Sequence, residues 1–167
     1  MSQPNTLEKH GSTMFLRATV VALGLIAVGL CALVLPAVFS HWSEEYPDIA
    51  HLRYPVLLIL SATVVPFFIA LYQTLKLLNF VDQNKAFSKA SVEALGKIKY
   101  SAVIFGALYA AFLPIDYLIA QEEDAPGLVV IGMMMTAAPI VIAVFAAVLQ
   151  KLLQSAIAIK FENDLTV

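Results

Sequence analysis

Asp116 is the one formal charge inside the four long apolar stretches of this chain, so it is the first residue to consider for chemistry. A carboxyl group within a membrane-spanning helix is costly to bury, which makes it a functional candidate by default. Arg53 or His51 is available to pair with it, as a lock between helices, a proton-responsive switch or the mouth of a polar cavity. A structural or water-facing role for Asp116 stays open beside these.

A second group of reactive side chains gathers between the first two apolar stretches. It holds two imidazoles and three carboxylates, at His41, Glu44, Glu45, Asp48 and His51. Such groups are ligands for divalent metals, but no pair among them has the spacing of a dedicated zinc site. The sequence therefore favours an ordinary acidic loop, with a metal site as the weaker hypothesis.

Other arrangements that carry catalysis or cofactors are missing from the sequence. Ser61, Thr63 and Thr136 are isolated polar residues, suited to bonding backbone carbonyls or neighbouring helices. Cys31 is the only cysteine and is expected to be a small buried apolar residue. The lysines of the middle connection lack an aromatic stacking array, which disfavours direct nucleic-acid binding. We expect a non-enzymatic protein without a cofactor.

Four stretches must carry these side chains, at about residues 18–39, 54–75, 100–120 and 127–149. Each is long enough to cross the roughly 30 Å hydrocarbon layer as a helix. With 60% apolar and 13% charged residues, the chain also departs from the soluble average. We predict an all-α fold, a single integral membrane domain over 1–167, with four transmembrane helices in an antiparallel bundle. The first stretch is too long for a signal-peptide core.

Positive charge is sorted to one side of these spans. Nine lysines and arginines lie in the N-terminal segment, the middle connection and the C-terminal tail: Lys9, Arg17, Lys76, Lys85, Lys89, Lys97, Lys99, Lys151 and Lys160. The two opposite connections hold only Arg53. Cytoplasmic loops retain positive charge, so we predict that both termini and the 76–99 connection are cytoplasmic.

The middle connection is predicted to extend helices two and three into the cytoplasm. Apolar residues recur at helical spacing after a turn at Asn84 and Lys85, and Ser88 is the expected N-cap of helix three. The mixed surface of Lys85, Lys89, Glu93 and Lys97 is a candidate for docking a soluble partner or lipid headgroups. An ordinary solvated hairpin is the alternative. Residues 1–13 are expected to form a loose leader.

Small residues and prolines bear on how the spans pack. Gly106 with Ala110, and Ala107 with Ala111, recur at four-residue spacing and match Ala143 and Ala147. Such faces let helix backbones approach, within one chain or between copies. Each span also has a proline in or near it, at Pro36, Pro66, Pro114 and Pro139. An interior proline bends its helix, and transporters use broken helices to build binding sites.

Several segments together resemble a known family. They are LYQTLKLLNFVDQNKAFSKASVEALGKIKY from Leu71 to Tyr100, RYP at Arg53 to Pro55, and the closing AVFAAVLQKLLQSAIAIKFENDLTV, with Asn84 to Ser88 the most specific part. The chain resembles uncharacterised four-span membrane proteins of Bacillus-type bacteria, catalogued as a domain of unknown function. The resemblance implies a bacterial plasma-membrane protein and, through frequent neighbouring helix-turn-helix regulators, a regulatory or stress-response role. It assigns no site residues.

The leading hypothesis is a membrane protein that acts by interaction, as a sensor or regulator or in self-protection against membrane-active peptides. Its partners would be the lipid bilayer, a cytoplasmic regulator or an extracellular peptide, and a second copy of the chain. The alternative is a small oligomeric transporter or channel that uses Asp116 and the proline-bent spans.

Overall fold

A computed structural model describes residues 6–165, and side chains over 13–163. The elements are α1 (Thr6–Glu45), a short 3₁₀ helix η1 (Ala50–Leu52), α2 (Arg53–Asp82), α3 (Lys89–Glu122) and α4 (Gly127–Leu165). The described part of the chain contains no strand, so the all-α prediction is confirmed. Each of the four long helices has the length and apolar content needed to cross a membrane.

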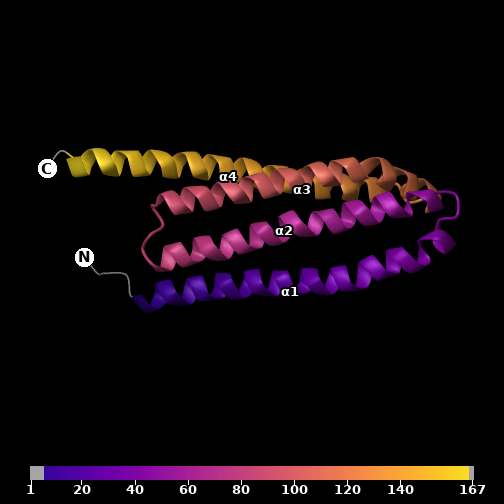
Figure 1. The fold of residues 1–167 in the computed structure, drawn as a ribbon, viewed down its shortest axis with the longest axis horizontal. Helices are drawn as coiled ribbons and strands as arrows, with labels where there is room; N and C mark the ends of the chain where they lie inside the picture. Colours follow the sequence, from indigo (N-terminus) through magenta and orange to yellow (C-terminus); the bar gives the residue numbers. More distant parts are fainter. Residues whose placement is uncertain (1–5, 166–167) are drawn as a thin grey trace.

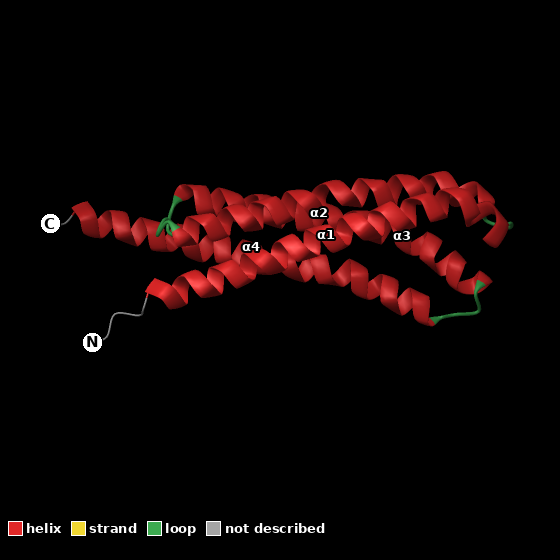
Figure 2. Ribbon diagram, turned by 90° about the horizontal axis from the view of Figure 1, so that it is seen from below, coloured by secondary structure: helices red, strands yellow, loops and turns green. Residues whose placement is uncertain are grey.

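The helices lie side by side in the order of the sequence, each antiparallel to the one before it (Figure 1). Contacts are most extensive between α3 and α4, then between α2 and α3 and between α1 and α2, while helices that are not consecutive touch little. Seen at right angles, α1 and α4 cross each other at different depths (Figure 2). The described ends of the chain, at Thr6 and Leu165, lie at the same end as the connection between α2 and α3.

Local sequence signals set the helix ends around the middle connection. After α2, Asn84 adopts a left-handed conformation with φ of 56°, which asparagine tolerates better than most residues. Ser88 then has extended geometry, and its Oγ accepts a hydrogen bond from the backbone N–H of Ser91 at 3.3 Å. The predicted turn and the predicted N-cap are both confirmed.

Helical structure extends further than predicted at both ends of the chain. The loose leader is wrong over 6–13, where α1 has already begun; residues 1–5 lie outside the described part. α4 likewise continues past the predicted span to Leu165. The backbone hydrogen bonds of a helix do not depend on the polarity of its side chains, so a helix can leave the membrane and continue. α1 and α4 therefore extend beyond their spans, as α2 and α3 do.

The seam between α3 and α4 uses only part of the predicted small-residue pattern. A methyl group on buried Gly106 would lie 3.2 Å from Cγ1 of Ile140 and 3.6 Å from the carbonyl oxygen of Thr136. Ala143 is buried and Ala147 half-buried, as expected for this seam. Ala107, Ala110 and Ala111 of the pattern are exposed and do not pack this seam, and their packing between copies stays a prediction. Four-residue spacing identifies a face, and only tertiary contacts say what that face meets.

A compact apolar core lies at the end where α1 joins α2. Trp42, Ile49, Val56 and Ile115 are buried together. The indole Nε1 of Trp42 donates to the carbonyl oxygen of Ile49 at 3.2 Å, which ties the connection to the end of α1. A buried indole needs such a partner. Trp42 is thus enclosed by protein, whereas Tyr54 at the start of α2 is exposed.

Candidate functional site

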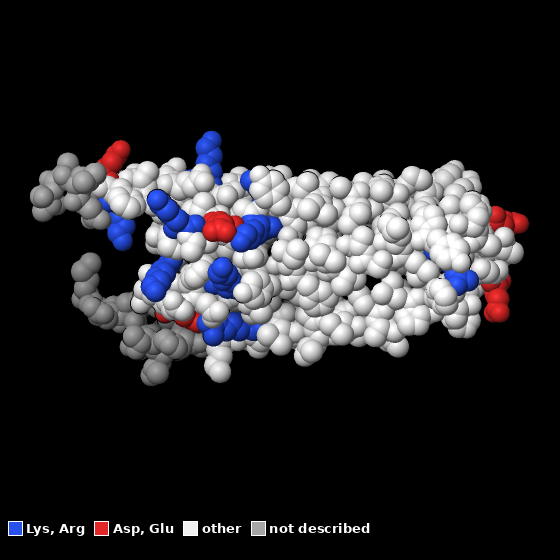
Figure 3. Space-filling model, viewed as in Figure 1, with Lys and Arg blue, Asp and Glu red and all other residues white. Residues whose placement is uncertain are grey.

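On the face shown in Figure 3, the lysine, arginine and acidic side chains gather toward the two ends of the molecule, with an uncharged belt between them. We call one end the lysine-rich end; its described cations are Arg17, Lys76, Lys85, Lys89, Lys97, Lys99, Lys151 and Lys160. The other, the acidic end, carries Glu44, Glu45, Asp48, Glu122, Glu123 and Asp124 with Arg53 as the only cation among the described side chains. The belt lies within the four candidate spans, and Asp116 is the one formal charge in the predicted stretches that cross it.

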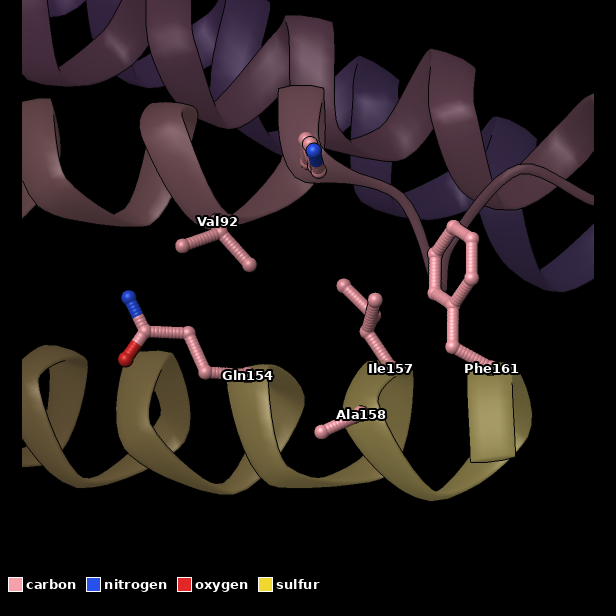
Figure 4. Close-up of a pocket in the computed structure, with 6 residues that line it drawn as sticks. Val92, Gln154, Ile157, Ala158 and Phe161 are labelled. Atoms are coloured by element: carbon pink, nitrogen blue, oxygen red, sulfur yellow. The ribbon is translucent and has the colours of Figure 1, made fainter. Parts of the chain in front are cut away.

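A groove opens at the lysine-rich end between the start of α3 and the extension of α4. We call it the α3–α4 groove; it has a volume of about 500 Å³ and is lined by Lys89, Val92, Gln154, Ile157, Ala158 and Phe161. Gln154, Ile157 and Phe161 project from one side of α4 toward the opposite wall of the groove, where Val92 lies (Figure 4). Its walls are thus largely apolar, with an ammonium group and an amide among the lining groups.

One polar residue of α4 holds the closed side of this groove together. The Gln150 amide Nε2 donates to the carbonyl oxygen of Val92 at 3.2 Å, and its Oε1 accepts from Nζ of Lys99 at 3.1 Å. A methyl group on Gly96 would lie 2.9 Å from Nε2, so the glycine makes room for the amide. Sequence reasoning missed this contact. Its signal was a glycine inside a helix and a lone amide just past the last apolar stretch.

A second polar contact, also missed, ties α1 to α2 at the same end. The Arg17 guanidinium pairs with Asp82 at 2.5 Å and donates to the side-chain oxygen of Asn79. The sequence showed Arg17 only as a cytoplasmic charge. Nothing in its spacing from Asp82 indicated contact, because the two residues lie on different helices.

The predicted docking residues divide into two sets. Lys89 lines the groove, and Lys85 is exposed in the connection before it. Glu93 and Lys97 instead form an exposed pair one turn apart, with Nζ and Oε1 2.8 Å apart. The hydrogen bond from Lys97 lowers the pKa of the Glu93 carboxyl group. These two residues satisfy each other, so the groove is the part of the predicted surface left with unpaired charge.

Asp116 and Arg53 do not form the suggested pair. Asp116 lies against Gly132 of α4, where a methyl group would overlap its Oδ2, and this buried oxygen has no hydrogen-bond partner among the described residues. Arg53 places its guanidinium carbon 4.1 Å from the centre of the Phe39 ring. A cation over an aromatic face is an alternative to an ion pair. His51 is not in salt-bridge contact with Asp116 either.

The weaker hypothesis of a metal site at the acidic end is not supported. Over the side chains described, no three His, Cys, Asp or Glu residues come together as metal ligands, so His41, Glu44, Glu45, Asp48 and His51 do not converge. His41 instead has its Nδ1 2.8 Å from the hydroxyl oxygen of Ser40. Asp48 and His51 lie beyond the end of α1, in the connection and in η1, and are therefore not on the helix that carries His41, Glu44 and Glu45.

The acidic end has its own link between distant segments. The hydroxyl group of Tyr46 donates to Oε1 of Glu123 at 3.0 Å and joins the end of α1 to the end of α3. Partial burial, with this hydrogen bond and the neighbouring carboxylates of Glu123 and Glu45, raises the pKa of Tyr46 to about 12. The phenol is therefore neutral at physiological pH.

Comparison with known proteins agrees with this four-helix membrane architecture. The model of a family described as "Protein of unknown function (DUF2975)" matches residues 38–167. The chain belongs to this family. The "Uncharacterized membrane protein YoaS" of Bacillus subtilis strain 168 is 51% identical to it over 156 residues, which cover 93% of this chain and 98% of that protein. No solved structure matches.

The DUF2975 match confirms the resemblance inferred from the sequence. It covers α2, α3, α4 and the end of α1, and so includes the whole α3–α4 groove. The name of the Bacillus relative describes a membrane protein, as do the four candidate spans of this chain. Neither comparison assigns an activity, so function has to be argued from the groove and its surroundings.

Proposed function

We propose that this DUF2975 protein is a non-enzymatic bacterial plasma-membrane protein that acts by binding a cytoplasmic protein partner in the α3–α4 groove, in a sensor or regulatory role. The observation that carries the proposal is the groove itself, a cavity of about 500 Å³ on helices that extend beyond the predicted spans. Its lining holds no Asp, Glu, His, Cys or Ser, so it offers a binding surface rather than a set of catalytic groups.

The proposal places the lysine-rich end in the cytoplasm. The described lysines and arginines at that end, against Arg53 alone at the other, support this orientation by the positive-inside rule. Both chain ends would then be cytoplasmic, since Thr6 and Leu165 lie at the lysine-rich end (Figure 1). The groove would face the compartment in which soluble regulators are found.

The chemistry of the groove fits an acidic amphipathic segment. Val92, Ile157 and Phe161 offer apolar contacts for one face of a helix or strand. Among the described side chains no acid forms a salt bridge with Lys89 at the groove, and Lys85 and Lys160 add positive charge at the same end. Charge of opposite sign on a partner steers association and fixes its register. An acidic partner is therefore favoured over a basic one.

In-cell photo-cross-linking tests the proposal. A photoreactive amino acid replaces Ala158 in the groove or, as the matched control, Leu152, which is exposed on the other side of α4. We expect a discrete protein adduct only from position 158, reduced at least about tenfold by Lys89→Glu, because charge reversal at an interface costs on the order of 1–3 kcal/mol. Lys97→Glu, which changes a lysine already paired with Glu93, should leave the adduct in place.

Three outcomes would contradict the proposal. Equal adducts from positions 158 and 152 would show that the groove has no preference, and loss of the adduct with Lys97→Glu alone would place the partner on another face. Lipid adducts without a protein adduct at position 158 would show that the groove lies against the membrane surface.

A further inference from the structure

Two of the cavities within the membrane belt share lining residues and lie away from the α3–α4 groove. The α1–α3 cavity, about 290 Å³, is bounded by α1, α2 and α3, and the α2–α4 cavity, about 360 Å³, is bounded by α2, α3 and α4. They arise from the order of the helices. Because α1 touches α3 little and α2 touches α4 little, the helix between each pair forms the floor of a crevice.

A pair of phenylalanine rings separates the two cavities. Phe67 of α2 and Phe105 of α3 line both of them, and their ring centres lie 6.4 Å apart. The aromatic contacts continue on both sides, from Phe67 to Phe68 at 5.6 Å and from Phe105 to Tyr109 at 5.1 Å. The cavities therefore share one aromatic wall.

The α1–α3 cavity lies close to the middle of the membrane. Cys31, Thr63 and Tyr109 line it from three helices, and each lies within about 4 Å of the midpoint of its predicted span at 1.5 Å per residue. Its lining carries no formal charge. The hydroxyl group of Thr63 already donates to the carbonyl oxygen of Leu60 at 2.7 Å. A molecule that enters from the bilayer must accordingly be uncharged and largely apolar.

Tyr109 supplies the one unused strong donor of this cavity. Its ring is stacked on Phe105 and meets Phe112 edge-on with centres 6.4 Å apart, which fixes its position. Within the described residues its hydroxyl group makes no hydrogen bond, although it lies at a depth without bulk water. A polar group left unpaired in hydrocarbon is unfavourable, so an acceptor atom on a ligand would be bound selectively.

We propose that the α1–α3 cavity binds an uncharged lipophilic molecule from the bilayer that carries a hydrogen-bond acceptor such as a carbonyl oxygen. The Tyr109 hydroxyl group donates to that acceptor, and the rings of Phe67 and Phe105 close the cavity toward α4. This site is independent of the cytoplasmic groove, and neither proposal depends on the other.

Benzophenone is a suitable probe because it is an uncharged aromatic ketone that attaches to nearby C–H groups under ultraviolet light. The full chain is placed in nanodiscs of phosphatidylethanolamine and phosphatidylglycerol, and attachment sites are mapped by mass spectrometry. We expect saturable labelling within segments 27–35 and 60–68, which supply the α1 and α2 residues of the cavity lining. Labelling spread evenly over lipid-facing residues such as Phe145, without saturation, would overturn the proposal.

Tyr109→Phe removes the hydroxyl group and keeps the ring. We expect it to raise the half-saturating concentration of benzophenone about three- to tenfold, the usual effect of one hydrogen bond. Competition by diphenylmethane, which lacks the carbonyl group, should be unchanged. Tyr117→Phe is the matched control, since Tyr117 is exposed on the same helix and lines neither cavity. Equal benzophenone affinity in wild type and Tyr109→Phe would contradict the proposal, because the cavity would then take apolar chains without recognising a hydrogen-bond acceptor.

The aromatic wall is tested with Phe67→Ala. Removing this ring should join the two cavities and let benzophenone label α4 at Met135 or Ala138, which line only the α2–α4 cavity. Phe68→Ala is the control, because Phe68 lines the α1–α3 cavity but not the α2–α4 cavity. Labelling of α4 in the wild type, or the absence of α4 labelling in Phe67→Ala, would contradict the claim that the Phe67 and Phe105 rings separate the two cavities. A helix of a second copy filling the cavity would abolish saturable labelling in every variant and overturn the proposal.

Discussion

The acidic end and the lysine-rich end differ in the balance of apolar and polar contacts that hold their helices together. At the acidic end Trp42, Ile49, Val56 and Ile115 are buried in one apolar cluster. At the lysine-rich end the links are polar: Arg17 to Asp82 between α1 and α2, and Gln150 to Val92 between α3 and α4. A buried apolar cluster packs side chains closely over a continuous surface. A few directed hydrogen bonds link two helices only at the bonded residues. The α3–α4 groove lies at the lysine-rich end, where such hydrogen bonds link the helices.

Connectivity explains this difference. At the acidic end the chain turns between α1 and α2 through η1, which brings the carbonyl oxygen of Ile49 to the Trp42 indole and folds apolar residues inward. At the lysine-rich end the described chain joins α2 to α3 through residues 83–88. α4 continues to Leu165 and forms one side of the α3–α4 groove.

The strongest test of the comparison is Trp42→Ala. Loss of a buried indole in a packed cluster removes apolar contacts and leaves a cavity, so we expect the free energy of unfolding to fall by about 3–5 kcal/mol. Thermal unfolding in detergent, followed by circular dichroism, measures it. Phe145→Ala is the control and should have little effect, because Phe145 is exposed in the membrane belt. Similar losses in both variants would mean that the acidic end has no special core.

Gly106→Val tests the seam between α3 and α4. The added side chain would press on Ile140 and the Thr136 carbonyl group, so we expect a loss of about 1–3 kcal/mol from overpacking. Gly29→Val in α1 is the matched control, since a methyl group there would meet nothing within 4 Å. The same thermal unfolding assay compares them. A larger loss from Gly29→Val would show that α1 is more tightly packed than its contacts indicate.

Asp82→Asn tests the polar link at the lysine-rich end. The Arg17–Asp82 pair is partly exposed, so we expect a loss of only about 0.2–1 kcal/mol, and a smaller one in about 1 M salt, where such pairs are screened. Glu93→Gln removes the more exposed pair with Lys97 and should change stability even less. Chemical unfolding in mild detergent measures both. A loss as large as that of Trp42→Ala would remove the contrast between the two ends.

The smallest effect at physiological pH concerns Tyr46. Its pKa is about 12 in the folded chain, above the ordinary value of 10.0. The neutral phenol is favoured by folding, so this contribution is complete below pH 10 and is lost as pH rises from about 10 to 12. We expect Tyr46→Phe to flatten this part of the pH–stability profile and leave the profile near pH 7 unchanged in shape. An identical alkaline loss in Tyr46→Phe would assign it to another group.

Some features of the candidate functional site could be predicted from the sequence. The turn at Asn84, the Ser88 cap and the presence of Lys89 on a docking surface followed from local spacing, and the structure bears out the first two and places Lys89 at the groove. The partners of Asp116 and Arg53 could not be read, because any contact between helices depends on their rotation about their axes. A cation is satisfied equally by a carboxylate or by a ring such as Phe39, and only proximity decides between them.

The sequence by itself determined that this is an all-helical chain with four membrane-spanning candidates, since the length and apolar content of a segment fix what solvent it can occupy. It also determined the family, through residues that extend across most of the chain. Only the tertiary structure decided that each helix packs mainly against its neighbours in the sequence. It also decided that the Gln150 side chain packs against Gly96 and that the Phe67 and Phe105 rings are in contact between two cavities. Lipid tails are as apolar as the helix faces, so the hydrophobic effect does not determine which helices associate in a membrane. Close packing of side chains determines it.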